Sequence, residues 1–158
     1  MVNLANPQPT DAYGIITHDI QENILIRGFT ELQLRIIYLT IRLSWGCSLK
    51  GWQYNALTDF ESIGIYKSDI GDQLRYLHNN RVIFLNEKYK IIMFNKNYDE
   101  WTIPVKKRSS IEKIKKLVGK SLENANEVRN LLTMLGLSGE QGKEITKGVH
   151  QNSERSKT

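Results

Sequence analysis

The chain has 158 residues, 40% hydrophobic and 25% charged, which fits one compact domain followed by a tail. A single cysteine, Cys47, excludes a disulfide framework and a thiolate metal cluster. The net charge of +5 is uneven, because residues 1–100 carry ten Lys and Arg against eleven Asp and Glu, whereas residues 101–158 carry twelve against six. The basic character therefore belongs to the C-terminal region, and total charge alone does not indicate a nucleic-acid partner.

The N-terminal residues indicate a cytoplasmic protein without a membrane partner. Residues 1–11 are polar, contain Pro7 and Pro9, and predict a flexible arm. They lack the basic and apolar segments of a secretion signal. No apolar run in the chain approaches the roughly 20 residues that span a bilayer.

The first predicted helix covers residues 18–27, with Thr17 as its N-cap and Gly28 at its end. Its inward-facing residues are expected to be Ile20, Ile24 and Leu25. Thr30 can cap a second helix, in which Ile and Leu are so dense as far as Leu43 that most of it must be buried. We expect this second helix to be the centre of the core.

Two arginines of the second helix, Arg35 and Arg42, lie about two turns apart and share a face. They are either solvated charges or ligands for a phosphate or an acidic partner. Between Trp45 and Ala56 the chain turns through two glycines, and only a short strand or an irregular loop is expected.

Residues 56–80 have the pattern of a helix-turn-helix. A short amphipathic segment containing Phe60 and Ile63 stops at Gly64, and a second segment carries Ile70, Leu74 and Leu77 at helical spacing. A turn of this kind sets the crossing angle at which a second helix can enter a major groove. A piece of an ordinary small helical core is the alternative interpretation.

Two apolar runs, residues 82–85 and 89–94, follow the helix-turn-helix and are separated by Asn86-Glu87-Lys88. Asparagine followed by charged residues is typical of a turn, so a β-hairpin is expected. The fold class predicted by this order of elements is α+β and mainly helical, a winged helix-turn-helix of three to four helices with a β-hairpin wing. The expected core residues are Ile20, Ile24, Leu34, Ile37, Leu39, Ile41, Ile70, Leu74, Leu77, Ile83 and Ile91.

The globular domain is expected to span residues 12–102, because Trp101 is its last apolar anchor and Pro104 with the charge run at 106–108 is typical of a linker. Residues 103–158 then form a basic, partly helical tail, with a helix over 111–119 capped by Ser110. A second amphipathic segment over 128–137 stops near Gly136, and the polar residues from Ser138 onward are expected to be disordered.

The sequence of the tail is compatible with several roles. Its basic amphipathic helix is suited to DNA or to an acidic partner surface, and less to a membrane because it lacks aromatic residues. The leucine-bearing segment is suited to pairing with a copy of itself, which would give a homodimer on DNA, or with a partner on the helicase side. The alternative is a solvated linker that folds only transiently.

No cluster of residues with catalytic or metal-binding spacing is apparent, so neither an enzymatic activity nor a cofactor is expected. His18, His78 and His150 lie on separate predicted elements. The Lys67-Ser68 pair lacks the leading glycine and the preceding strand of a phosphate-binding loop.

The second helix of the helix-turn-helix carries a set of residues suited to duplex DNA. Lys67 and Ser68 lie at its start, where backbone N–H groups and the helix dipole favour a phosphate. Gly71 permits a close approach to the groove, and Gln73 and Arg75 carry forked groups suited to base edges. The carboxylates oppose phosphate binding nearby unless they accept from a cytosine amine or hold the arginine; they are Asp69 and Asp72.

The predicted wing supplies Lys88 and Lys90 on either side of Tyr89. These three residues either grip the DNA backbone or minor groove beside the helix, or form a solvated hairpin tip. The near-neutral charge of the domain leaves a further interpretation open, that of a protein-interaction module with weak DNA contact.

The chain resembles the N-terminal domain of bacteriophage replication protein O over about residues 5–102. The matching segments are Asn6-Pro7-Gln8, Tyr13-Gly14, Thr17-His18-Asp19-Ile20 to Leu25, Leu34-Arg35-Ile36-Ile37 through Arg42, Trp45-Gly46, Ile63-Gly64-Ile65, Leu74-Arg75-Tyr76-Leu77 and Phe94-Asn95-Lys96-Asn97-Tyr98-Asp99-Glu100-Trp101. The closing Asn-Lys-x-Tyr-x-x-Trp is the most specific of them.

The resemblance implies a winged-helix domain that binds repeated double-stranded sites at a phage or prophage replication origin. It also implies recruitment of the replicative helicase or its loader in the cytoplasm of a bacterial host. In that family a separate C-terminal region carries the recruiting function, and the residues after position 102 show no motif matching such a region. A transcriptional regulator is the alternative within DNA binding, because the same fold reads operators.

Overall fold

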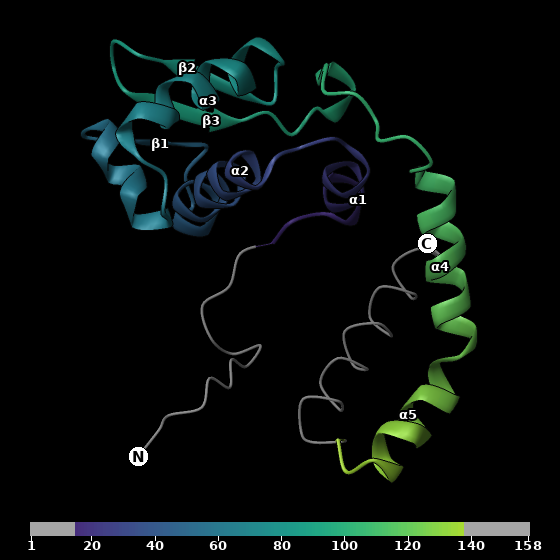
Figure 1. Cartoon of the computed structure of the whole chain (residues 1–158). Coiled ribbons are helices and arrows are strands. Elements are labelled where there is room, and N and C mark those ends of the chain that lie inside the picture. Colours follow the sequence, from purple (N-terminus) through teal and green to yellow (C-terminus); the bar gives the residue numbers. More distant parts are fainter. Residues whose placement is uncertain (1–14, 138–158) are drawn as a thin grey trace, which may run out of the picture. The chain divides into compact units, whose positions relative to one another are not determined.

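The computed structural model describes residues 15–137 (Figure 1). The predicted N-terminal arm and the polar segment from Ser138 onward lie outside the described residues. Helices and strands run in the order α1 His18–Ile26, α2 Glu31–Leu43, β1 Gly51–Gln53, α3 Lys67–Asn79, β2 Ile83–Asn86, β3 Ile91–Phe94, α4 Ile111–Glu123 and α5 Ala125–Met134. Short 3-10 helices lie at η1 Trp45–Cys47, η2 Leu57–Ile63 and η3 Tyr98–Glu100. The described residues up to Ile114 form one compact unit, and those from Lys115 belong to another.

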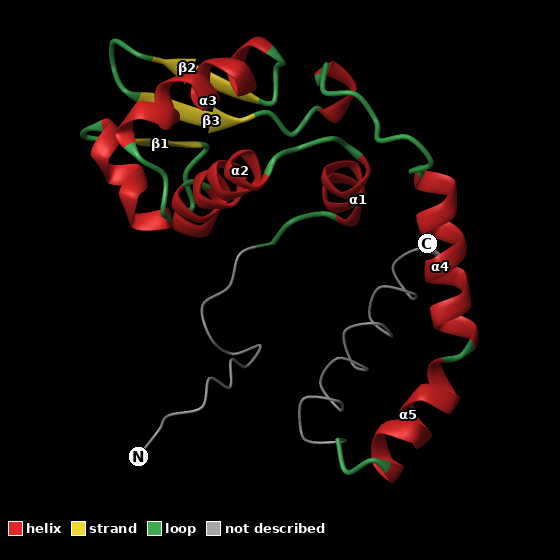
Figure 2. Ribbon diagram, viewed as in Figure 1, coloured by secondary structure: helices red, strands yellow, loops and turns green. Residues whose placement is uncertain are grey.

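A small antiparallel sheet has the strand order β1-β3-β2 (Figure 2). Its register pairs Ile92 with both Trp52 and Leu85, and places Ile83 opposite Phe94. The α+β class and the helix-turn-helix followed by a hairpin are confirmed, in the arrangement of a winged helix. The expected core position of Ile91 is wrong, because Ile91 is 43% exposed while Ile92 is fully buried. Neighbouring strand residues face opposite sides of a sheet, so a shift of one residue exchanges core for surface.

Helix α2 is the central core helix, as predicted. Thr30 and Gln33 form a capping box, in which Thr30 Oγ1 accepts from the Gln33 N–H and Gln33 Oε1 accepts from the Thr30 N–H. Ile36, Ile37 and Ile41 are buried. The helix packs against β1, β3 and α3, and therefore joins the sheet to the helix-turn-helix.

Helix α1 buries Ile20 and Ile24 as expected, but Leu25 is wrong because it is 70% exposed. The inward positions next to the isoleucines are Asn23 and Ile26. One residue advances a helix by about 100°, so the residue after Ile24 turns toward solvent. The Asn23 amide satisfies its own polarity by donating to the Asp19 carbonyl at 2.9 Å.

The C-terminal edge of the domain pairs with the end of α1. The Gly28 N–H donates to the Pro104 carbonyl at 3.1 Å, and the Lys106 N–H donates to the Ile26 carbonyl at 2.7 Å. The Arg27 guanidinium donates to the carbonyls of Trp101 and Ile103 as well, at 3.3 and 2.8 Å. Backbone pairing therefore continues to Lys106, past the residue 102 at which the sequence placed the end of the domain.

The segment from Asn95 to Trp101 closes the domain through a set of side-chain bonds. The Asn95 amide donates to the Arg81 carbonyl at 2.8 Å and to the Glu100 carboxylate at 3.0 Å. The buried Trp101 indole donates to the Asn95 carbonyl at 2.8 Å. Asn95, Glu100 and Trp101, which belong to the most specific part of the resemblance, are thus held by local bonds.

Helices α4 and α5 contain no buried residue. Ser110 Oγ accepts from the Lys113 N–H at 3.2 Å, which confirms its capping role, although α4 continues to Glu123 rather than ending at 119. Past the end of α5, Gly136 has φ +71°, a conformation that favours glycine. None of the helices between residues 15 and 137 has the length and apolarity to cross a membrane.

Candidate nucleic-acid interface

The exposed face of α3 lies opposite its buried Ile70, Leu74 and Leu77. Exposed residues on it include Lys67, Ser68, Asp69, Asp72 and Arg75. The helix begins after Tyr66, whose side chain makes no capping bond, and Tyr66 itself is 72% exposed. The first turn therefore keeps N–H groups open to an anion, as expected of a helix start without a side-chain cap.

The turn before α3 fixes how the helix is presented. Gly64 adopts φ +78° and donates to the Glu61 carbonyl, which ends η2, and Ile65 then enters the core at 1% exposure. A left-handed backbone is open to glycine at little steric cost. The glycine that ends the first segment in the sequence therefore performs the predicted role.

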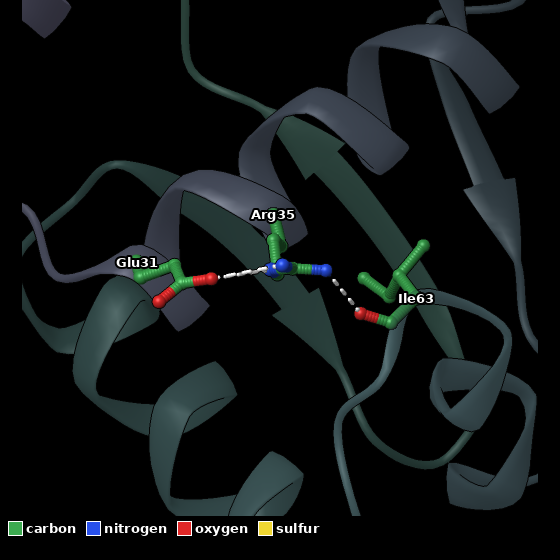
Figure 3. A network of polar contacts seen from close by, with 3 residues as sticks. All are labelled: Glu31, Arg35 and Ile63. Atoms are coloured by element: carbon green, nitrogen blue, oxygen red, sulfur yellow. Dashed lines mark hydrogen bonds and ion pairs between the residues drawn. The ribbon is translucent and has the colours of Figure 1, made fainter.

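Arg35 of α2 forms a hydrogen bond with the segment before this turn (Figure 3). Its guanidinium donates to the Ile63 carbonyl at 3.0 Å and pairs with Glu31 at 2.8 Å. The carbonyl belongs to the last residue of η2, where a helix end leaves carbonyl groups without partners. Arg35 thus has a structural contact, whereas Arg42, the other arginine of that face, is exposed beside Cys47.

Gln73 does not join the exposed face, which corrects its expected place among the base-reading side chains. It is half-buried, and its Oε1 accepts from the Gln33 Nε2 at 3.1 Å. Because Gln33 also closes the capping box of α2, one buried amide connects the start of α2 to the middle of α3. This contact orients α3, and the sequence could not show it because the partners are 40 residues apart.

Arg75 lies on the exposed face and turns toward the wing. Its Nε lies 3.2 Å from Glu87 Oε1, and its Nη1 lies 3.6 Å from Asp72 Oδ1. Gly71 and Arg75 line an open cleft of about 320 Å³ together with Tyr54, Glu87 and Lys90. Burial and, to a smaller extent, the charge of Glu87 raise the pKa of Tyr54.

The wing tip differs in register from the sequence expectation. Asn86 still belongs to β2 and pairs with Ile91, so the turn comprises residues 87–90 instead of 86–88. Asn86 Oδ1 accepts from the Tyr89 N–H at 3.0 Å, a local side-chain bond that closes the turn. All three predicted wing residues, Lys88, Tyr89 and Lys90, remain exposed at this tip.

Only one of the two wing lysines is free of a hydrogen bond to the domain among the described residues. Lys90 Nζ donates to the Asn55 carbonyl at 2.6 Å, and Lys90 has φ +55°. Lys88 Nζ lies 5.3 Å from the centre of the Tyr89 ring, a cation–π contact that leaves its charge toward solvent. Lys88 is therefore the better placed of the two to reach a phosphate.

His78 connects α3 to the wing, a contact that the sequence did not reveal. Its Nδ1 accepts from the Leu85 N–H of β2 at 3.1 Å. The contact holds the first wing strand beside the end of the helix. A histidine seven residues before an apolar strand residue is a weak signal, so only the tertiary structure identifies this bond.

Charge on this face is nearly balanced. The cations Lys67, Arg75, Lys88 and Lys90 are accompanied by the carboxylates Asp69, Asp72 and Glu87. Within residues 15–137 no group of three or more His, Cys, Asp or Glu side chains is arranged to hold a metal ion. The face is thus a set of separated charges and hydrogen-bonding groups on a helix and a hairpin tip.

Comparison with known proteins gives a family match. The family model of bacteriophage replication protein O matches residues 7–101, which include α1, α2, the helix-turn-helix and the wing. No curated protein and no solved structure matches the chain.

Proposed function

Because the chain belongs to the bacteriophage replication protein O family, we propose that it binds specific double-stranded sites at a phage or prophage replication origin. Replication would then begin through recruitment of the helicase machinery, in the cytoplasm of the bacterial host. The domain acts in this proposal as a binding module without enzymatic activity. The observation that carries it is the exposed face of α3, which stands beside the wing tip with Lys67, Arg75 and Lys88 all open to solvent.

In the proposed complex, α3 enters the major groove. Lys67 and Ser68 meet a phosphate at the helix start, and Arg75 donates both Nη groups to the O6 and N7 atoms of a guanine. Lys88 contacts the backbone beside the helix, where a contact positions the protein without reading sequence. Gln73 is not part of this complex, because it is engaged with Gln33.

Two substitutions separate base reading from backbone contact. Arg75→Ala is expected to weaken binding to a selected site by ~1–3 kcal/mol and to relax the preference at one position. Lys88→Ala is expected to weaken binding to all duplexes about equally and to lower the salt slope by about 1. Arg42→Ala, on the exposed side of α2, serves as the control. Unchanged affinity in both wing and helix variants would place the docking face elsewhere.

Sequencing of bound genomic fragments tests the origin role. Several clustered repeats beside an AT-rich segment are expected. A single palindrome at a promoter would instead identify a transcriptional regulator. Retention of helicase or helicase loader by the immobilised full chain is the matching test of recruitment, and absence of both proteins from the eluate would contradict that part of the proposal.

A second candidate function, a protein-interaction module with weak DNA contact, rests on the balanced charge of the face. Non-specific affinity depends on phosphate neutralisation, so a balanced face predicts little of it. Binding of the chain to its selected site at low salt, measured by fluorescence anisotropy, decides between the two. Absence of binding to every duplex would favour the protein-interaction module.

A further inference from the structure

The ion pair between Arg75 and Glu87 joins two different elements of the domain, α3 and the wing. Three ion pairs occur among residues 15–137, and the other two join residues three or four apart on one helix. The Arg75–Glu87 pair joins α3 to the wing tip across 12 residues of sequence, with 3.2 Å between Nε and Oε1. The base-reading side chain of the proposed function is therefore connected to a carboxylate of the wing.

The geometry leaves one edge of the guanidinium open. Glu87 occupies the Nε side of Arg75, and Asp72 lies at a looser 3.6 Å from Nη1. A guanine accepts from the two Nη groups at the end of the fork, so it can bind while Glu87 keeps its contact. A phosphate that approached the Nε side would have to displace Glu87 and would meet its negative charge.

We propose that Glu87 is a specificity-determining residue, which positions Arg75 for a base edge and disfavours its contact with phosphates. This inference rests on the proposed function. The side chains are 60% and 61% exposed, so the pair is open to DNA and weak enough to be adjusted on binding. Glu87 thereby reduces affinity for random duplex more than affinity for the correct site. Sequence preference then increases because binding to random duplex, which competes with the correct site, is weakened. The repulsive element that such specificity needs is the negative charge of Glu87.

Glu87→Gln in the full chain tests this role. The probes are a duplex of random sequence and the selected site, titrated by fluorescence anisotropy at several salt concentrations. Random-duplex affinity is expected to rise about two- to fivefold, the range that removal of one exposed ion pair allows. The salt slope for random duplex is expected to rise by about 1, because the freed Arg75 contacts an additional phosphate. The ratio of selected to random affinity falls accordingly.

Glu61→Gln is the matched control, because it removes the same charge from an exposed residue outside the three ion pairs of the described residues. The double variant Arg75→Ala/Glu87→Gln then shows whether the effect of Glu87→Gln on random-duplex affinity depends on Arg75. Disappearance of the affinity gain in the double variant supports the inference. A gain that persists without Arg75, or an equal gain in Glu61→Gln, overturns it and leaves the proposed function standing. Absence of binding to both duplexes by the unaltered chain overturns the proposed function, and this inference with it.

Discussion

Arg27 joins the end of α1 to the C-terminal edge of the domain. Its guanidinium donates to the carbonyls of Tyr98, Trp101 and Ile103, and it lies 5.6 Å from the centre of the Trp101 ring. Burial lowers the pKa of Arg27, and the charge of Asp99 opposes that shift. The side chain nevertheless stays charged, because an arginine is not deprotonated in proteins.

Replacement of Arg27 by Ala is expected to lower the free energy of unfolding by about 2–3 kcal/mol, since it removes charged donors from half-buried carbonyls. Urea unfolding at constant slope measures the change. Arg42→Ala is the control, and at an exposed site it is expected to cost less than about 0.5 kcal/mol. Equal shifts of the two midpoints would mean that Arg27 does not hold the C-terminal edge.

At the scale of elements, the helix-turn-helix contains two glycines that differ in their role. One is needed for its backbone conformation and the other for its lack of a side chain. Gly64 needs its positive φ of +78°, whereas Gly71 lies within α3, one turn from both Lys67 and Arg75. A Cβ added to Gly71 meets only Arg75 Nη1 at 3.8 Å, an ordinary contact distance. Stability alone would therefore favour alanine at Gly71.

Gly71→Ala is expected to raise the free energy of unfolding by up to about 1 kcal/mol, the difference in helix propensity. The same variant is expected to bind the selected site several-fold more weakly, because the added methyl group stands between α3 and the groove. Urea unfolding and fluorescence anisotropy measure the two effects on one sample.

Gly64→Ala provides the contrast, with a decrease of about 1 kcal/mol in stability because alanine resists the left-handed conformation. If Gly71→Ala were to bind DNA as tightly as the unaltered chain, close approach of α3 at this position would be disproved.

At the scale of the whole molecule, the excess of basic residues and the face proposed to read DNA sequence lie in different parts of the chain. The proposed docking face is nearly neutral, whereas Lys106, Lys107, Arg108 and the lysines of α4 come later in the sequence, after Trp101. Binding of phosphates by this basic segment would add affinity without base information.

Substitution of Gln for Lys113, Lys115, Lys116 and Lys120 together is expected to reduce random-duplex affinity and to lower its salt slope by up to about 3.6, or ~0.9 for each phosphate that is no longer neutralised. The preference at each position of the selected site is expected to stay unchanged. Anisotropy titrations with single-position variants of the site measure this preference. The variant with Arg in place of the same four lysines keeps the positive charge and serves as the control. A changed preference would bring α4 into the specific complex.

Local features could be predicted from the sequence because their causes lie within a few residues. The Thr30 cap of α2, the turn at Gly64, the Ser110 cap and the apolar spacing of α3 each depend on neighbours along the chain. The order of these elements also predicted the winged-helix arrangement, whereas the family was identified from a resemblance of particular segments, above all the one from Phe94 to Trp101. The identity of the exposed residues of α3 followed from the spacing of its buried ones.

Tertiary structure alone decided the features that join distant residues. Strand register buried Ile92 and exposed Ile91, and helix orientation turned Leu25 outward. Pairing across the fold took Gln73 away from the docking face, joined Arg75 to Glu87, and brought Arg27 to Ile103, at separations of 40, 12 and 76 residues. Local periodicity says which face of an element is apolar, but a polar side chain takes its partner from whichever element packs beside it, and that neighbour is determined only when the whole core assembles.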